Sequence, residues 1–461
     1  MAETDKRGVW SSKIGFILAG AGSAIGLGAI WRFPYLTGEN GGALFVIMFL
    51  ICCFLIGYPV MIAELSLGRN TEKNPVGMFN KLSGNKWLWK LVGGLCVLSG
   101  FTIFSWYSVI AGWVFGYLYK TSIGTFNNIH DPAAISEIFT QFVGSPLNVI
   151  FFHAVVIFVT AYVVYRGVKN GIEMLSKWLM PVLFVLLILL MIRSITLPGS
   201  SEGLIFYLKP DFSKITSFKE FGSLVLAAMG QALFSLSIGM GTMITYGSYL
   251  SKKENIPASA AWITFFEILV SLFAGFVIMP AVSAMGKDYA AGPKLIFEIL
   301  PSIFGQMPGG YWFGIGFFIL VIIAAITSTV SILEVPVAYF VDEKKWSRRT
   351  AVVFTSIIAL IIGIPAGLAF GASGFFTKLP VINVNFFKII STAFGDISLS
   401  IGAFFIALFV GFVWKTSKAT EEITAEGNRF TFYKMWGFII KYIAPITVAI
   451  VFGNVLWNAF Q

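Results

Sequence analysis

The sequence is poor in the residues that carry most enzyme chemistry. Among 461 residues there are two histidines, His130 and His153, and three cysteines, Cys52, Cys53 and Cys96. The histidines lack metal-ligand spacing, and the cysteines fall in apolar segments, where a disulfide framework is not expected. The sequence contains neither a phosphate-binding glycine loop with its lysine nor a nucleophile-elbow serine. We therefore do not expect an enzyme.

Charged residues are also scarce. They make up 12% of the chain, against 57% hydrophobic residues, whereas a soluble domain carries about 25% charge. Apolar runs of about 20 residues, long enough to cross a hydrocarbon layer of about 30 Å, recur along the whole length. Because they are too long for barrel strands, they predict an all-α integral membrane protein. The eleven predicted spans lie near residues 14–37, 42–68, 88–119, 147–165, 172–195, 221–249, 257–285, 311–340, 350–370, 391–414 and 433–458.

The basic residues indicate a membrane topology. A net charge of +10 would by itself be compatible with a nucleic-acid partner. Lysine and arginine nevertheless collect in alternate loops, which is typical of the cytoplasmic side of a membrane protein. We therefore expect a bilayer and no nucleic acid as partner, a multi-pass location in a bacterial inner membrane, a cytoplasmic N-terminus and an external C-terminus. The basic loop residues are Lys6, Arg7, Lys13, Arg69, Lys73, Lys81, Lys86, Lys90, Arg166, Lys169, Lys177, Lys252, Lys253, Lys344, Lys345, Arg348 and Arg349.

Two apolar stretches contain an unusual number of poor helix formers. Residues 20–34 read GAGSAIGLGAIWRFP, and residues 234–248 read FSLSIGMGTMITYGS. Glycines such as Gly22 and Gly26 also permit close helix packing, which would explain either stretch alone. Interruptions in both the first and the sixth span are instead typical of an inverted-repeat transporter with its site near mid-membrane. Unwound backbone at that depth offers N–H groups to a carboxylate and carbonyl oxygens to a cation.

Longer motifs around these stretches resemble one family, the neurotransmitter:sodium symporters, and particularly its eleven-span bacterial amino-acid symporters. The matching segments are GSAIGLGAIWRFPYLTGENGG from Gly22, FSLSIGMGTMITYGSY from Phe234, AAITSTVSILE from Ala324, and Tyr107 followed by Gly112-Trp113. The resemblance implies a leucine-transporter-like fold: an inverted repeat of five plus five helices, with helices 1 and 6 unwound at mid-membrane and an eleventh helix added. The implied segments are 1–13 (cytoplasmic N-terminal segment), 14–196 (helices 1–5), 197–220 (extracellular loop), 221–414 (helices 6–10), 415–432 (cytoplasmic loop) and 433–461 (helix 11).

The resemblance also implies a substrate site. The carboxylate would be held by the N–H groups of Gly26, Leu27 and Gly28 and by Tyr107. The ammonium would meet carbonyl groups near Ala24, Phe234 and Ser235, and Phe234 with Tyr107 would close the site from outside. The side chain would be surrounded by Ser23, Ile25, Ile103, Ser237, Met240, Ser328 and Ile332.

Gly26 indicates the class of substrate. Monoamine-carrying relatives have aspartate at this position, whereas glycine leaves room for the substrate's own carboxylate, so we expect an α-amino acid. The apolar residues nearby favour an apolar or aromatic side chain, with simple packing as the alternative explanation.

One of the two sodium sites that the family implies is intact in the sequence. This second site would be formed by carbonyl groups of the first and eighth spans together with two hydroxyls. Serine and threonine also bond to their own helix in membrane spans, which is the alternative explanation for the hydroxyls. The implied ligands are Gly22, Ile25, Ala324, Thr327 and Ser328.

The first sodium site departs from the family pattern. The family's asparagine after Gly-Leu-Gly is Ala29 here, and the seventh-span position aligns with Glu267. Ala24 and Ser235 would supply the remaining oxygens. Either Glu267 compensates for the lost amide and keeps the ion, or the site is empty, Glu267 is protonated part of the time, and transport uses one sodium ion or protons. The implied cofactor is Na⁺, one or two ions.

Chloride is not expected as a further ion. Chloride-dependent relatives use a second-span tyrosine, which is Phe49 here, although Gln231, Ser235 and Ser271 remain. Glu267 would also supply the negative charge that chloride provides beside the cation.

Both gates have candidate residues. The resemblance pairs Arg7 with Asp342 on the cytoplasmic side, covered by Trp10. On the outer side Arg32 matches, but the position of its family partner is Ser391. Asp396, a little over one turn further on, is a possible substitute, and water or other polar side chains are the alternative. Tyr107 and Phe234 complete the outer closure.

Glu64, in AELSLGR, is another acidic residue inside a predicted span. We expect it to accept hydrogen bonds from the unwound sixth span in a structural role.

The most direct interpretation is a sodium-coupled symporter that imports an α-amino acid by alternating access. A proton-coupled or single-sodium carrier is an alternative on the same architecture, and a non-transporting amino-acid sensor is an alternative of another class. No obligatory protein partner is evident from the sequence.

Overall fold

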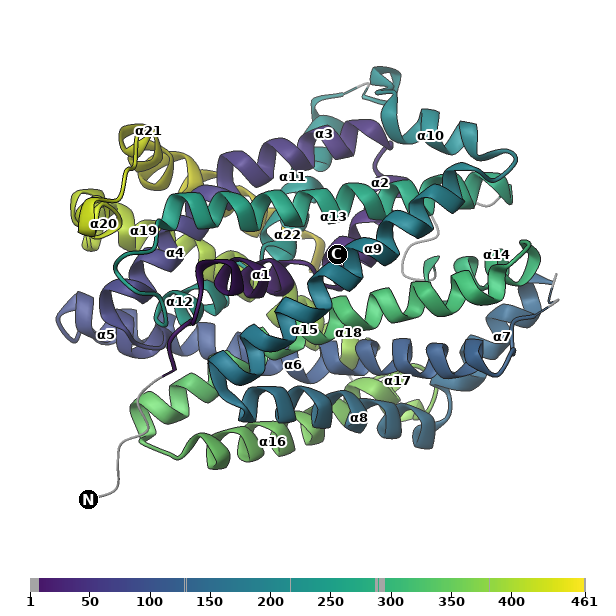
Figure 1. The fold of residues 1–461 in the computed structure, drawn as a ribbon, viewed down its shortest axis with the longest axis horizontal. Coiled ribbons are helices and arrows are strands. Elements are labelled where there is room, and N and C mark those ends of the chain that lie inside the picture. The colour runs from purple at the N-terminus through teal and green to yellow at the C-terminus, as the bar shows by residue number, and fades with distance from the viewer. Residues whose placement is uncertain are drawn as a thin grey trace.

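The computed structural model describes residues 8–459, apart from residues 128, 130, 216, 287–288, 290–294 and 381; the side chains of residues 132, 214 and 455–459 are also left undescribed. Within these limits every regular element is a helix. The long helices run roughly side by side, with α5 and α20 at one end of the bundle and α7 and α14 at the other (Figure 1).

The element bounds, with η marking 3₁₀ and π helices, are as follows. The first half of the chain contains α1 (Lys13–Ala24), η1 (Gly28–Arg32), α2 (Phe33–Glu39), α3 (Ala43–Cys52), η2 (Cys53–Gly57), α4 (Tyr58–Thr71), α5 (Pro75–Ser83), α6 (Trp87–Ser122), α7 (Pro132–Val143), α8 (Pro146–Tyr165), η3 (Val168–Glu173), α9 (Met174–Ile195), α10 (Ser200–Leu208) and η4 (Phe212–Lys214). The second half contains α11 (Phe218–Ser235), α12 (Thr242–Gly247), α13 (Ile256–Ala284), α14 (Ile299–Gln306), α15 (Gly310–Lys344), α16 (Arg348–Leu368), α17 (Gly374–Thr377), α18 (Phe386–Ser391), η6 (Thr392–Ile397), α19 (Ser398–Leu408), η7 (Phe409–Val413), α20 (Thr416–Ile423), η8 (Ala425–Gly427), α21 (Tyr433–Phe438), η9 (Ile439–Ile443) and α22 (Ala444–Ala459).

By length and composition, nine helical runs among the described residues can each cross a membrane. A tenth span is obtained if the two segments Lys13–Ala24 and Gly28–Glu39, which meet at an angle of 50°, are counted together. The predicted sixth span coincides with α11 and α12, which are separated by residues 236–241. Helix α12 has 6 residues, and neither helix is among the nine counted runs.

The segments predicted as loops contain short helices. The segment 197–220 includes α10 and η4, and 415–432 includes α20. Helix α10 lies against α13, because Gly203 approaches the backbone of Met279 closely and the Tyr207 hydroxyl donates to the Leu272 carbonyl at 3.0 Å. These contacts explain why the loop sequence folds locally.

Side-chain caps fix where several helices begin. Ser12, Asn74, Ser145 and Asn255 each accept a hydrogen bond from the backbone of the first turn that follows. Such caps satisfy N–H groups that have no partner inside the helix.

The two glycine-rich stretches end their helices inside the bundle. Helix α1 stops at Ala24 and α11 stops at Ser235. In the second break Gly239 and Gly241 have φ angles of 92° and 77°, a conformation that glycine adopts without strain. A Cβ on Gly239 would also lie 2.2 Å from the Leu399 carbonyl oxygen, so this position has room only for glycine.

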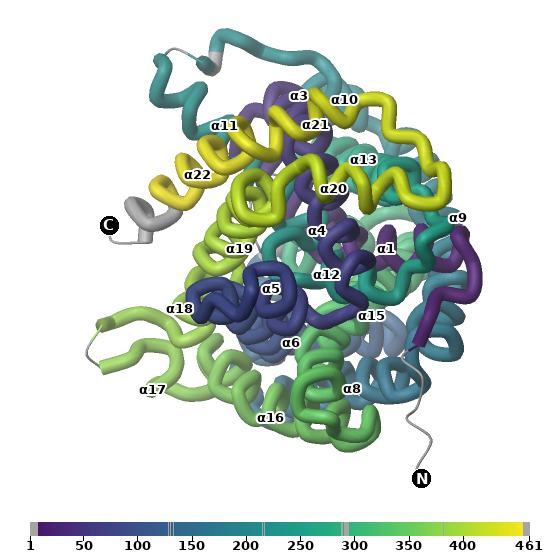
Figure 2. The backbone as a smooth tube through the Cα atoms, turned by 90° about the vertical axis from the view of Figure 1, so that its left-hand side faces the viewer, coloured from purple at the N-terminus to yellow at the C-terminus, as the bar shows by residue number. Residues whose placement is uncertain are grey.

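Seen along the bundle, α12 and α4 lie near its centre and α16, α17 and α22 lie outside (Figure 2).

A buried ion pair joins α4 to α20. Arg69, whose side chain is fully buried, donates to Glu422 Oε1 at 2.8 Å and also to the Glu422 carbonyl. Lys252 and Asn70 donate to the same carboxylate. Burial alone would raise the pKa of Glu422, but the hydrogen bonds from Lys252, Asn70 and Arg69 outweigh it and leave the pKa lowered. The network fastens the loop before the last helix to the end of α4.

Replacing Glu422 by glutamine is expected to destabilise the protein by about 3–5 kcal/mol, because Arg69 is left buried without its counter-charge. Since the folded-state pKa is lowered, the stabilisation is present above the unfolded pKa and is lost as the pH falls through the folded value. Thermal unfolding in detergent at several pH values measures both effects. Equal unfolding temperatures for wild type and Glu422→Gln near neutral pH would show that the pair contributes nothing.

Candidate functional site

The two helix breaks face each other across a cavity. Its volume is about 20 Å³, room for roughly one water molecule, so a larger ligand requires the surrounding elements to move apart. Apart from Ile25 and Leu27, every residue expected to bind substrate lines this cavity. The lining residues are Ser23, Ala24, Gly26, Gly28, Ile103, Tyr107, Phe234, Ser235, Ser237, Met240, Ser328, Ile332 and Leu399.

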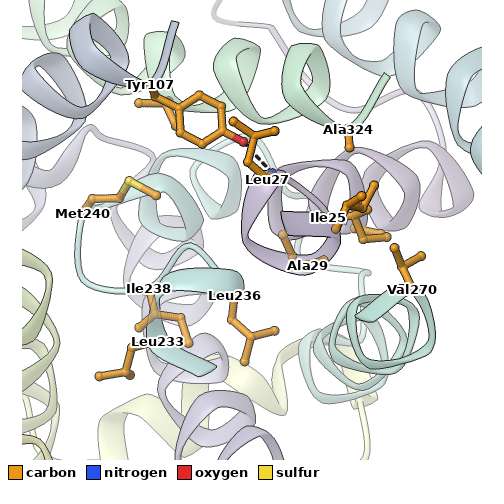
Figure 3. Close-up of a cluster of buried hydrophobic side chains, with 14 of the residues drawn as sticks. Ile25, Leu27, Ala29, Tyr107, Leu233, Leu236, Ile238, Met240, Val270 and Ala324 are labelled. Carbon is orange, nitrogen blue, oxygen red and sulfur yellow. Dashed lines mark hydrogen bonds between the residues drawn. The ribbon is translucent and has the colours of Figure 1, made fainter. Parts of the chain in front are cut away.

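Tyr107 reaches the first break from α6. Its hydroxyl accepts a hydrogen bond from the Leu27 N–H at 2.8 Å, and Figure 3 shows the ring directed at the backbone there. A Cβ on Gly26 would lie 2.7 Å from this hydroxyl and 2.5 Å from Ser328 Oγ. Because residue 26 is glycine, the phenol of Tyr107 and the hydroxyl of Ser328 approach the backbone more closely than any side chain would allow.

Serine hydroxyls beside the cavity donate their hydrogens to other groups. Ser237 Oγ donates to the Ser23 carbonyl at 2.9 Å, Ser328 Oγ donates to the same carbonyl at 3.1 Å, and Ser23 Oγ donates to Ser331 Oγ at 2.7 Å. Since the hydrogens are used in this way, the oxygens offer lone pairs to further donors or cations. The polar side of the cavity is therefore suited to positive groups.

Several residues expected to form the second sodium site lie close to one another. Ser328 Oγ on α15 lies 3.3 Å from the Gly22 carbonyl oxygen on α1, and Gly22 approaches the Thr327 side chain closely. Thr327 Oγ1 donates to the carbonyl groups of Ile323 and Ala324 in its own helix. This is the bonding expected if the hydroxyl has no role in ion binding. The carbonyl and hydroxyl oxygens expected as ligands thus lie on two adjoining helices.

Glu267 lies beside the second break, fully buried. Its Oε1 accepts hydrogen bonds from Ser235 Oγ and, at 2.8 Å, from Ser271 Oγ. Among the described residues Oε2 has only the Cys53 thiol, a weak donor, at 4.0 Å. The Gln231 amide donates to the Gly28 carbonyl at 2.8 Å. Both hydroxyls, and one of the two amide N–H groups, that an anion could use are therefore already bonded to acceptors.

Two further expectations concern α3 and α4. Phe49, at the position of the family's tyrosine, packs its ring 4.8 Å from that of Phe33 and has no polar group to offer. Glu64 Oε1 accepts the Gly239 N–H at 2.8 Å, which is the contact with the sixth span expected from the sequence.

The residues expected to form the outer gate include an ion pair. Arg32 lies 3.2 Å from Asp396 Oδ1 and 4.7 Å from the centre of the Phe234 ring. Ser391, by contrast, donates to its own helix at the Lys388 carbonyl. Asp396, considered only as a possible substitute, is therefore the partner of Arg32. The pair also borders a hollow of about 190 Å³, lined by Leu27, Trp31, Arg32, Tyr35, Trp106, Tyr107, Phe234, Phe387, Ser391, Gly395 and Asp396.

Of the residues expected to form the inner gate, Arg7 lies outside the described residues. Trp10 donates from Nε1 to the Tyr246 carbonyl at 3.0 Å and so covers the end of α12. Asp342 Oδ2 accepts hydrogen bonds from the backbone N–H of Asn74 at 2.9 Å and from its amide at 3.2 Å.

Sequence reasoning missed two parts of this arrangement. Leu399 lines the cavity from α19, and no motif marks it. Glu334 on α15 pairs with Arg348 at 2.5 Å and accepts the Tyr249 hydroxyl at 2.7 Å. Glu334 is the last residue of the AAITSTVSILE motif, so an acidic residue at the end of an apolar motif was the available signal.

Comparisons with known proteins agree with this geometry. A family model described as "Sodium:neurotransmitter symporter family" matches residues 7–128 and 135–460. An uncharacterized sodium-dependent transporter of Bacillus subtilis, YhdH, is 38% identical over 97% of this chain and 97% of its own length. A similar transporter of Methanocaldococcus jannaschii is 31% identical over 99% of this chain and 92% of its own length. The crystal structure of MhsT in complex with L-phenylalanine superposes with a TM-score of 0.88 at 42% identity, over 97% of this chain and 100% of that one.

Proposed function

Because the chain belongs to the sodium:neurotransmitter symporter family, we propose that it imports an α-amino acid together with sodium by alternating access. Its relatives are sodium-dependent membrane transporters and not enzymes. The observation that supports the proposal is Gly26, where the absence of a side chain lets the Tyr107 and Ser328 hydroxyls approach the backbone of a helix break. These groups are suited to a carboxylate once the cavity widens.

The two ends of an amino acid meet different surroundings. Once the surrounding elements move apart, the carboxylate would lie beside Gly26 and Tyr107, where backbone N–H groups at a helix start favour negative charge. The ammonium fits the carbonyl groups at Ala24 and Phe234 and the lone pairs of Ser237. Each end thus has partners of opposite polarity within one cavity.

An apolar or aromatic side chain is the preferred substrate class. The rest of the cavity is lined by apolar groups, namely those of Ile103, Met240, Ile332 and Leu399. The related MhsT structure contains L-phenylalanine, which supports this class. Because the cavity is small as it stands, side-chain size is expected to decide how far Phe234 must move.

Sodium couples to the substrate through the helix breaks. An ion held by Gly22, Ile25, Ala324, Thr327 and Ser328 would join α1 to α15. A second ion near Ala24, Ser235 and Glu267 would join the first break to α13. Ions at these places stabilise the arrangement of backbone that receives the substrate, so binding of each favours the other.

Chloride has no role in this proposal. The Ser235 and Ser271 hydroxyls and the Gln231 amide already donate to acceptors, and Glu267 supplies negative charge. The alternative of a proton-coupled or single-sodium carrier also rests on Glu267. Ala29 offers no side-chain ligand to an ion at the first site, and the two serine hydroxyls can stabilise Glu267 without an ion.

The two repeats of the transporter are proposed to be residues 14–196 and 221–414, with helix 11 at 433–461. The basic loops place the N-terminus in the cytoplasm and the C-terminus outside. We place an outer closure at Arg32 and Asp396 and an inner closure at Trp10 and Tyr246, which is supported by the ion pair and the hydrogen bond between these residues.

Uptake into proteoliposomes tests the proposal. The purified protein is first screened for thermal stabilisation by each of the twenty amino acids, in sodium and in potassium. A stabilising amino acid is expected to accumulate inside vesicles only under an inward sodium gradient. Accumulation driven by a proton gradient in potassium would favour the alternative, and sodium-dependent binding without flux would contradict transport.

A further inference from the structure

Glu173 connects the start of α1 to the start of the fifth predicted span. Its Oε1 accepts hydrogen bonds from Ser11 Oγ at 2.6 Å and Ser12 Oγ at 2.9 Å, and its Oε2 accepts the Ser11 N–H at 2.7 Å. Lys177 Nζ pairs with Oε1 at 2.7 Å from the same helical run. Glu173 is 1% exposed, and charge-assisted hydrogen bonds are strong where water is excluded.

The start of α1 is shaped to receive this carboxylate. A Cβ on Gly15 would lie 2.0 Å from Glu173 Oε1, so the first turn leaves room for the carboxylate only because residue 15 is glycine. Ser12 also caps the helix by accepting the Gly15 N–H at 3.1 Å. The positive end of the helix dipole therefore faces the negative charge of Glu173.

The other end of α1 borders the substrate cavity. Helix α1 runs from Lys13 to Ala24, about 18 Å at 1.5 Å per residue. Ser23 and Ala24 line the cavity, and the Gly22 carbonyl oxygen faces Ser328. If the helix moves away from the bundle at its start, the hydrogen bonds from Ser11 and Ser12 to Glu173 must break.

We propose that Glu173 is a positioning residue that tethers α1 in the closed inner conformation and so sets how readily the transporter opens inward. This inference rests on the proposed function, because inward opening has meaning only for a carrier. The tether is separate from Asp342, which is bonded to Asn74 on another part of the inner face.

The test compares Glu173→Gln with Lys177→Met in the full-length protein. Glutamine has nearly the same shape, but its amide cannot accept the Ser11 N–H as well as the two hydroxyls. Lys177→Met removes the ion pair within the helical run and leaves the bonds to α1 in place. Ser11→Ala, on the exposed segment before α1, is a milder variant that serves if Glu173→Gln does not fold.

Hydrogen–deuterium exchange of residues 13–24 is the first measurement. We expect exchange about tenfold faster in Glu173→Gln, about threefold faster in Ser11→Ala and unchanged in Lys177→Met. Residues 87–122 of α6 should be unaffected in all three variants. Exchange in α1 that is the same in Glu173→Gln and Ser11→Ala as in wild type would overturn the proposal, and so would an equal effect of Lys177→Met.

Sodium-dependent uptake of L-phenylalanine is the second measurement. The half-saturating sodium concentration should rise about tenfold in Glu173→Gln, because the sodium-binding conformation becomes less populated. The maximal rate at saturating sodium should not fall, a separation that a simple folding defect would not produce. A fall in maximal rate with unchanged sodium dependence would overturn the proposal. If the wild type shows no sodium-dependent uptake of any amino acid, the proposed function fails, while the exchange comparison still decides whether the tether exists.

Discussion

Replacing Gly26 by alanine is expected to lower amino-acid affinity by about a hundredfold while the protein still folds. The new Cβ would lie 2.5 Å from Ser328 Oγ and 2.7 Å from the Tyr107 hydroxyl. Both are ends of side chains that can shift a little, so the fold tolerates the methyl group. The space proposed for the carboxylate is lost, because the methyl group occupies it. Titration with the stabilising amino acid in sodium measures the affinity, and thermal unfolding reports on the fold.

Gly94→Ala is the matched control. Gly94 lies in α6, where a Cβ would meet nothing within 4 Å. Alanine in such a helical position stabilises by about 0.5–1 kcal/mol, and substrate affinity should stay at the wild-type value. Unchanged affinity in Gly26→Ala would mean that the carboxylate does not bind between Gly26 and Tyr107.

Much of the architecture could be predicted because its signals are local. Long apolar runs predict spans, and two clusters of glycine within such runs predict breaks, which the chain has after Ala24 and Ser235. The comparisons confirm the predicted family, the leucine-transporter-like fold and the prediction that the protein is a transporter and not an enzyme. The assignment of individual site residues and of the two repeats stays a prediction.

Some contacts between distant segments could not be predicted, because π-helices change the direction in which their side chains point. Asp396 lies in the π-helix η6, Thr392–Ile397. A π turn adds a residue and rotates the side chains that follow, whereas the match to the family's aspartate position points to Ser391. Glu173 likewise ends the π-helix η3. In both cases the acidic residue was visible in the sequence, but its direction was not.

Buried partners in separate segments were equally hidden. Arg69 and Glu422 are 353 positions apart, and each is unremarkable among its neighbours in sequence. Charged residues are almost never fully buried unless paired, but the sequence does not reveal which of its charges are buried. The packing of α20 against α4 buries both charges, and each then needs the other as its partner.

Replacing Glu267 by glutamine is expected to raise the half-saturating sodium concentration for uptake by about tenfold to a hundredfold, because a full charge beside the ion is lost. If Glu267 is a sodium ligand, protons compete with sodium for it. Wild-type uptake should then need more sodium as the pH falls, and the glutamine variant should lose this dependence. Initial rates across sodium concentrations at several pH values measure both effects.

Ser271→Ala and Glu267→Ser complete this test. Ser271→Ala removes one hydrogen bond to Glu267 but keeps the charge, so sodium dependence should change little. Glu267→Ser releases the Ser235 and Ser271 hydroxyls from the carboxylate, and they can then donate to an anion. Uptake by this variant should be stimulated by chloride over gluconate, whereas the wild type should be indifferent to the exchange. Sodium dependence that is the same in Glu267→Gln as in wild type at every pH would instead indicate that the first site is empty. In that case Glu267 carries no sodium, and a single ion between α1 and α15 has to supply the whole coupling.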